Sequence, residues 1–177
     1  MKKPFSNHLC VLIDNSSEKL GRSIAWLTLF MVVTQFSVVV LRYLFNVGWI
    51  SMQESILYMH GFVFMLGAAY TLKHDGHVRV DIFYHKMGVR GKALVDILGT
   101  LFLLLPVCVF IISYSWDYVA NSWALLEGSR EAGGLAGLFL LKGSIVLMPL
   151  LLILQGLSQF IKNLLTLFKH SSDNVHV

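Results

Sequence analysis

Hydrophobic residues in this chain form four long stretches that are separated by polar segments. The stretches run from roughly Ser23 to Phe45, Ile50 to Leu72, Ala93 to Val119 and Leu135 to Phe160. An α-helix of about 20 apolar residues crosses the hydrocarbon core of a bilayer, so each stretch is long enough to span a membrane. The pattern predicts an all-α integral membrane protein with four transmembrane helices in a single domain, residues 1–177.

Composition supports this interpretation. Hydrophobic residues make up 56% of the 177, charged residues 14%, and the mean hydropathy is +0.69. A soluble domain is nearer to about 25% charged. The third stretch contains Pro106, which predicts a tilt or a kink in that helix and not a break.

The positions of lysine and arginine predict the orientation, because positive charge is retained on the cytoplasmic side. The N-terminal segment, the middle loop and the C-terminal tail hold 11 of the 14 basic residues, whereas the other two connections hold only Arg130. We therefore expect both termini and the middle loop in the cytoplasm. The net charge of +4 reflects this asymmetry and does not indicate nucleic-acid binding.

Two polar segments have the spacing of short amphipathic helices lying along the membrane surface. In the N-terminal segment the apolar positions near one helical face are Leu9, Leu12, Ile13 and Leu20. In the cytoplasmic loop between Lys73 and Lys92 they are Val78, Ile82 and Val89. We expect one interfacial helix in each segment.

Arg42 and Glu54 are opposite charges just inside the first two spans, on either side of one short connection. A charge within a bilayer costs roughly 2.5 to 3.5 kcal/mol on insertion scales, so such residues usually find a partner. We expect the two to form an ion pair that ties the outer ends of these spans. Trp49, between them, is placed to anchor the chain at the headgroup level.

Two alternatives to a scaffold use the polar residues of the spans. A haem-binding membrane anchor needs two facing histidines, but only His60 lies well inside a span. An autonomous small carrier needs a carboxylate that takes up protons, whereas Glu54 lies near the outer end with Arg42 available to keep it ionised. Scaffold and autonomous carrier or cofactor protein therefore stay open as classes from the residues alone.

Enzyme chemistry has no support in the sequence. Asp96 and Asp117 are 21 residues apart, or roughly 30 Å along a helix, and no serine and histidine spacing marks a nucleophile and its base. Cys10 and Cys108 form no CxxC motif. We expect no catalytic residue, no metal site and no cofactor.

Small residues in the second and fourth spans allow helices to approach closely, either within the bundle or against a partner. They are Gly61, Gly67, Ala68, Ala69, Gly137 and Gly143. Lys142 lies near the outer end of the fourth span and can extend outward, where Glu127, Arg130 and Glu131 offer nearby charges.

An ordered set of these residues resembles a known family. The set is Arg42, Tyr43, Phe45, Trp49 and Glu54, then Gly67, Ala68 and Ala69, then His77-Val78-Arg79-Val80-Asp81. It is similar to the small membrane subunit, the DctQ-like or Q subunit, of tripartite ATP-independent periplasmic (TRAP) transporters. Gly133-Gly134-Leu135, Lys142 and Gln155-Gly156 resemble the branch grouped with mannitol, chloroaromatic or 2-oxo acid uptake.

The resemblance implies a secondary transporter of the bacterial inner membrane in three parts. The partners would be a large membrane subunit (M), which carries sodium and an organic acid by an elevator motion in symport, and a periplasmic substrate-binding protein (P). This chain would enlarge the fixed scaffold and hold no substrate site. The implied structural or subunit-interface residues are Arg42, Trp49, Glu54, Gly67, His77, Arg79, Asp81 and Lys142. The residues expected to contact the binding protein are Trp123, Glu127, Arg130 and Glu131. His77, Arg79 and Asp81 are expected to contact the large subunit or phospholipid headgroups.

Overall fold

The chain folds into long helices, which a computed structural model describes for residues 5–77, 84 and 86–173. They are α1 (Phe5–Phe45), α2 (Ile50–Lys73), α4 (Val89–Gly99), the π-helical turn η1 (Thr100–Leu104), α5 (Leu105–Ala124) and α6 (Leu138–Asp173). The segments long and apolar enough to cross a membrane are His8–Phe45, Ile50–Lys73, Val89–Ala124 and Leu138–Phe168. The predicted all-α class with four spans is therefore confirmed.

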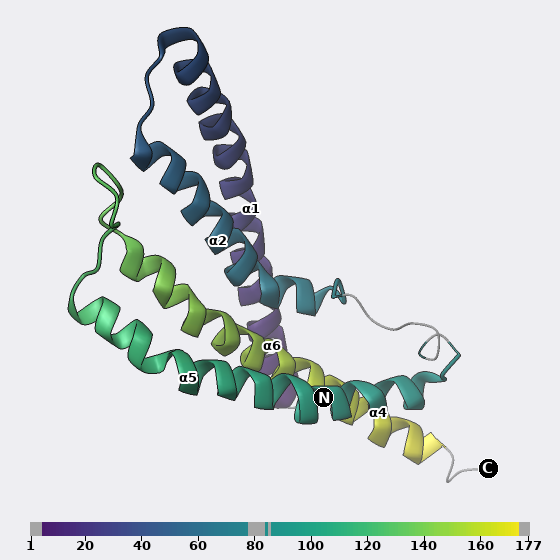
Figure 1. Ribbon diagram of the computed structural model, residues 1–177. Helices are drawn as coiled ribbons and strands as arrows, with labels where there is room; N and C mark the ends of the chain where they lie inside the picture. The colour runs from purple at the N-terminus through teal and green to yellow at the C-terminus, as the bar shows by residue number, and fades with distance from the viewer. Residues whose placement is uncertain (1–4, 78–83, 85, 174–177) are drawn as a thin grey trace.

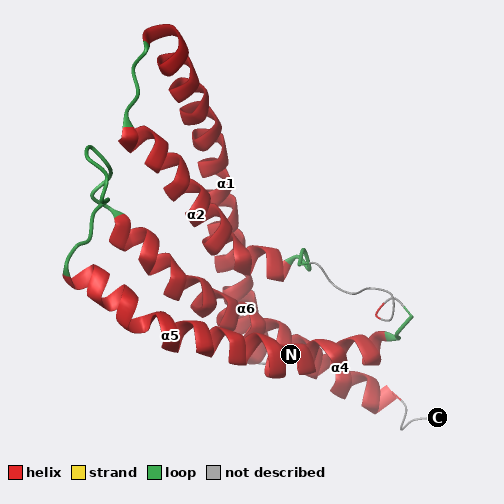
Figure 2. Cartoon of the chain, in the orientation of Figure 1, coloured by secondary structure: helices red, strands yellow, loops and turns green. Residues whose placement is uncertain are grey.

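The helices form two hairpins that diverge from each other, as Figures 1 and 2 show. One hairpin is α1 with α2, and the other is α5 with α6. Helix α6 joins them, because it packs against α2, against α4 and α5, and against part of α1. We call the end with the short connections 46–49 and 125–137 the outer end, and the end where α2 stops and α4 begins the inner end.

Helix α1 is longer than the expected first span. Its 41 residues extend about 60 Å at 1.5 Å per residue, twice the roughly 30 Å of the hydrocarbon core. The residues expected to form a separate N-terminal interfacial helix are its first turns. Side-chain contacts with α6 hold this part of α1, and such contacts override a weak local break such as Gly21, which costs a helix only about 1 kcal/mol. Helix α6 likewise continues to Asp173, beyond the expected end at Phe160.

The expected helix in the middle loop cannot be compared with the structure over its whole length. Val78 and Ile82 lie outside the described residues, as do Arg79 and Asp81 of the HVRVD string. Val89, the third apolar position of that pattern, is the first residue of α4.

The third span contains a π-helical turn next to Pro106. The π-helical turn η1 ends at Leu104, directly before α5, in which Pro106 is the second residue. Proline has no backbone N–H to donate and its ring clashes with the carbonyl one turn earlier, and a local π turn relieves both effects. The hydroxyl of Thr100 donates to the Asp96 carbonyl at 2.8 Å in the same region.

Most apolar side chains face outward, as expected for helices surrounded by lipid or by other subunits. The buried apolar residues within the described part of the chain are Cys10, Ile24, Ala69, Leu72, Ala93, Cys108, Val119 and Pro149. Few apolar side chains are thus buried between the helices, and polar side chains contribute to the contacts that hold the helices together.

Gly21 is a point of close approach between α1 and α2. A Cβ atom at this position would lie 2.3 Å from the Tyr70 ring and 2.7 Å from the Tyr70 Cβ, so rotating the ring cannot make room. Gly21→Ala should therefore destabilise the chain by about 1 to 3 kcal/mol through overpacking. Thermal unfolding in detergent measures the effect. Gly67→Ala is the matched control, because a Cβ there meets nothing within 4 Å; equal melting temperatures for both variants would contradict the prediction.

Candidate interaction sites

Glu54, near the start of α2, holds the outer connection between α5 and α6. Its carboxylate accepts a hydrogen bond from the hydroxyl of Ser129 and another from the backbone N–H of Leu135, the latter at 2.6 Å. The loop is also closed on itself, since the N–H of Ser129 donates to the Leu135 carbonyl at 2.8 Å. One side chain of the first hairpin thus joins the outer loop of the second.

The Gly133-Gly134-Leu135 string now has a geometric explanation. Gly133 has a φ of +79°, a left-handed conformation that favours glycine. At Gly134 a Cβ would lie 2.4 Å from Ser129 Oγ and 2.7 Å from Glu54 Oε2, so any side chain would displace the carboxylate. Leu135 then supplies the N–H. The three residues together form the receiving site for Glu54.

The expected ion pair between Arg42 and Glu54 is wrong. Arg42 is exposed near the end of α1, and no contact joins it to Glu54 in the described part of the chain. The physical reason is that the first hairpin is open at its outer end, while the loop 125–137 approaches α2 and offers two donors to the carboxylate (Figure 1). Proximity along the chain did not translate into proximity in space.

Lys142 forms a second outer contact. Its ammonium group lies 2.5 Å from a carboxylate oxygen of Glu127 and 4.1 Å from the centroid of the Tyr118 ring. The lysine side chain is only 12% exposed. The hydrogen bond from Lys142 lowers the pKa of the Glu127 carboxyl. Lys142 therefore links α6 to the loop through Glu127 and to α5 through Tyr118.

This ion pair predicts a pH-dependent stability. Because the pKa of Glu127 is lower in the folded chain than its ordinary value of 4.5, the pair stabilises the fold above that value and the contribution is lost as the pH falls through the lowered pKa. Lys142→Met should have a lower melting temperature than the wild type. The difference between the two melting temperatures should be largest at neutral pH and should shrink in acid. Lys19→Met, at an exposed position of α1, is the control. A difference that stays constant down to about pH 3 would contradict this role.

A buried polar network joins the inner parts of α1 and α6. The Asp14 carboxylate accepts hydrogen bonds from Gln155 at 3.1 Å and Ser158 at 2.9 Å, and it also pairs with Lys162. The Ser17 hydroxyl donates to the Gln155 side-chain oxygen at 2.7 Å. Gln155 and Ser158 are completely buried, so these bonds satisfy groups that water cannot reach.

Glu18 makes an adjacent cluster between α1 and the inner end of α2. Its carboxylate lies 2.7 Å from the Lys73 ammonium group, 2.9 Å from His74 and 2.8 Å from the Arg22 guanidinium group. In α6, one turn after Gln155, the side-chain amide of Gln159 donates to the Leu72 carbonyl near the end of α2, at 2.7 Å. Three helices therefore meet at the inner end through polar contacts.

The remaining predicted residues are distributed over the surface. Trp49 and His77 are exposed at opposite ends of α2, and Gly67 has no neighbour that a Cβ would meet within 4 Å. Trp123 packs edge-on against Phe139 at 5.1 Å and lies over Gly143. Arg130 and Glu131 are exposed in the outer loop. The structure thus brings Glu54 and Lys142 to one loop, where Lys142 meets Glu127. Among the other predicted residues that the structure describes, Trp49, His77, Trp123, Arg130 and Glu131 are exposed.

Sequence reasoning missed the inner network. The signal was present, since Asp14 and Ser17 share one helical face and Gln155, Ser158 and Lys162 recur at helical spacing near the end of the fourth span. A separate surface helix in the N-terminal segment would not place Asp14 and Ser17 beside these residues of α6. A helix that continues from the first span carries Asp14 to α6.

The fold and these sites define a multi-pass membrane protein whose polar side chains tie helices and loops to one another. The family model described as tripartite ATP-independent periplasmic transporters, DctQ component, matches residues 30–166. The chain therefore belongs to this family and is a small membrane subunit of a TRAP transporter, a transporter component and not a member of an enzyme family. Neither the curated proteins nor the solved structures include a match to the chain.

Proposed function

We propose that this chain is a scaffold subunit that packs against the large membrane subunit of its transporter. In the complete system it would support sodium-coupled, binding-protein-dependent uptake of an organic acid across the bacterial inner membrane. The observation that carries the proposal is the family match, which extends over residues 30–166 and so includes part of the first span, all of the second and third spans and most of the fourth. The coupling sodium would bind in the large subunit, and we expect no cofactor in this one.

The outer surface of the first hairpin is suited to a partner subunit. In α1 the side chains of Trp26, Phe30 and Val33 are exposed and recur at helical spacing along one stripe. In α2, Gly67 leaves its helix surface open, which permits a second helix to approach closely. We infer that this hairpin, which diverges from α5, supplies the face toward the large subunit (Figure 1).

The outer loop is the proposed contact for the binding protein. Arg130 and Glu131 are exposed there, while Glu127 is engaged with Lys142 and the exposed Trp123 packs edge-on against Phe139. Arg130 and Glu131 are therefore the charges that a soluble partner would meet first. At the inner end, exposed His77 is placed to contact the large subunit or the headgroups, with Arg79 and Asp81 assigned the same role from the sequence pattern.

Co-expression and reconstitution test the scaffold role. A tagged copy of this chain should co-purify with the large subunit, and proteoliposomes should take up solute only with sodium, the binding protein and both membrane subunits present. Gly67→Leu should reduce recovery of the large subunit, while the melting temperature of the isolated chain stays unchanged. Sodium-dependent uptake by this chain alone would overturn the proposal and support an autonomous carrier instead.

A further inference from the structure

Two short rows of polar side chains lie on the membrane-spanning part of the first hairpin without a partner. One row is Gln35 and Arg42 in α1, and the other is Gln53 and His60 in α2; the members of each row are seven residues, or about two turns, apart. All four side chains are exposed. Among the residues that the structure describes, no hydrogen bond or ion pair involves these side chains.

The two polar rows reach the middle of the membrane. Arg42 and Gln53 lie three residues from the outer ends of α1 and α2, whereas Gln35 and His60 lie ten residues from them. Ten residues rise about 15 Å, which is half of the roughly 30 Å hydrocarbon core. Because α1 and α2 run in opposite directions from one short connection, each depth has one polar side chain from each helix.

The row in α2 faces away from the rest of the chain. It continues with Gly67, seven residues after His60, where an added Cβ would meet nothing within 4 Å. The other sides of α2 are occupied, since Tyr70 packs against α1 and the Met65 sulfur accepts a hydrogen bond from Ser144 of α6 at 3.0 Å. A polar row that ends at a small residue suits close approach by a further helix.

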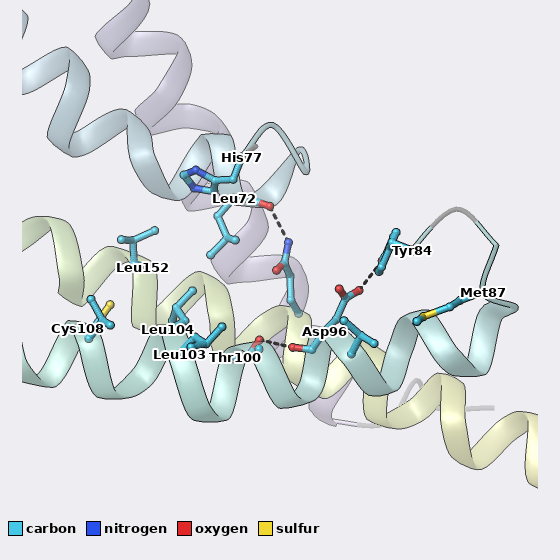
Figure 3. Close-up of a pocket in the computed structure, with 14 residues that line it drawn as sticks. Leu72, His77, Tyr84, Met87, Asp96, Thr100, Leu103, Leu104, Cys108 and Leu152 are labelled. Carbon is cyan, nitrogen blue, oxygen red and sulfur yellow. Dashed lines mark hydrogen bonds between the residues drawn. The ribbon is translucent and has the colours of Figure 1, made fainter. Parts of the chain in front are cut away.

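Other polar side chains of the spans show how such groups are satisfied within the chain. A groove of about 660 Å³ beside the π turn η1 contains Gln159, whose amide donates to the Leu72 carbonyl at 2.7 Å. In the same groove the Thr100 hydroxyl donates to the Asp96 carbonyl (Figure 3). Gln35 has no such acceptor. Unpaired polar groups in hydrocarbon are costly and therefore rare, so the two polar rows require a partner outside the chain.

Chemistry distinguishes the candidate partners. A phosphate headgroup can reach Arg42 near the outer end, but lipid offers no hydrogen-bonding group to Gln35 and His60 at the middle of the bilayer. A second copy of this chain, related by a two-fold axis along the membrane normal, would bring two Arg42 side chains to the same depth, where like charges repel. A helix of another membrane protein can instead supply an acidic residue and further hydrogen-bonding groups.

We propose that one transmembrane helix of the large subunit lies along the two polar rows. That helix carries a carboxylate that pairs with Arg42. About seven residues deeper in the membrane, it carries a side chain that hydrogen-bonds to Gln35 and His60. The inference rests on the proposed scaffold role and specifies a polar contact, in addition to the apolar stripe of α1 described above.

Binding of the large subunit to the full-length chain in mixed micelles tests the proposal, with energy transfer between the labelled subunits as the readout. Gln35→Leu should weaken binding about threefold, the average effect of one interhelical hydrogen bond in a membrane. Arg42→Met should weaken it by about tenfold or more, because the partner carboxylate loses its counterion. Asn121→Leu in α5 and Lys19→Met in α1 are the matched controls at exposed positions and should bind like the wild type.

The same measurement separates this inference from the scaffold role. Neither Gln35→Leu nor Arg42→Met should change the melting temperature of the isolated chain, because neither side chain has a partner within it. If the wild type binds and both variants bind equally well, the polar rows are not the contact, although the scaffold role stands. No binding by the wild type would contradict the scaffold role itself. Weakening by Arg42→Met alone would assign the arginine to lipid headgroups and overturn the proposal.

Cross-linking in the assembled complex identifies the partner. Gln35→Cys and His60→Cys, each carrying a photoreactive group, should modify the same helix of the large subunit. That helix should contain an aspartate or glutamate about seven residues from the modified position. Labelling of lipid alone, or of a second copy of this chain, would overturn the proposal.

Discussion

Asp14→Ala should lower the free energy of unfolding of the chain by roughly 2 to 6 kcal/mol. The substitution removes the acceptor for Gln155 and Ser158, which are completely buried and have no water to replace it. Each buried donor left without a partner costs about 1 to 3 kcal/mol. The α1–α6 contact at the inner end should therefore open, and α1 should lose its support beyond the first span.

Reversible unfolding in mixed detergent, followed by circular dichroism, measures this effect. Asp14→Asn retains an oxygen that accepts from Gln155 and Ser158 while losing the Lys162 ion pair, so it should restore most of the stability. Asp117→Ala, at an exposed position of α5, is the control for loss of a carboxylate. If Asp14→Ala unfolds at the same detergent fraction as Asp117→Ala, the network does not stabilise the fold.

Glu54→Ala should release the outer loop from α2. The loop loses the acceptor for both the Ser129 hydroxyl and the Leu135 N–H, and the carboxylate no longer fills the space beside Gly134. Hydrogen exchange of the Leu135 amide should accelerate by about tenfold or more, because hydrogen bonds to charged groups are among the stronger ones. Mass-spectrometric exchange over residues 127–137 reports this change. Glu54→Gln, which keeps one acceptor oxygen, should be intermediate.

Arg42→Ala distinguishes the contact between Glu54 and the outer loop from the Arg42–Glu54 ion pair that was expected from the sequence. It should leave exchange in the outer loop unchanged, because the arginine is exposed and Glu54 keeps both donors. The double substitution Arg42→Glu with Glu54→Arg should fail to restore protection. Rescue by that charge swap would instead reinstate the pair between the two helices.

Much of the fold could be predicted because membrane spans depend on local composition. The expected end of the first span at Phe45 and start of the second at Ile50 coincide with the helix ends, and a π turn lies next to Pro106 in the third. Helix ends outside the membrane were harder to predict. The polar first turns of α1 look like a surface helix until α6 is known to lie beside them.

The candidate sites divide in the same way. A lysine near the end of a span and a short charged loop placed Lys142 close to Glu127, Arg130 and Glu131, and the structure selects Glu127 as its partner. The partner of Glu54 could not be found in this manner, since Ser129 is 75 residues away and the contact depends on how the two hairpins diverge. Arg42 was the nearest opposite charge along the chain, but it is not the partner in space.

The sequence by itself determined that this protein is a four-span membrane subunit, because apolar length and the ordered family residues are properties of the chain. Opposite charges alone determined only that Glu54 needs a partner. The tertiary structure decided that the partner is the outer loop, that Asp14 joins α1 to α6, and that a groove lies beside the π turn. The physical reason is that hydrogen bonds act over about 3 Å, so only the packing of helices selects which distant polar groups meet.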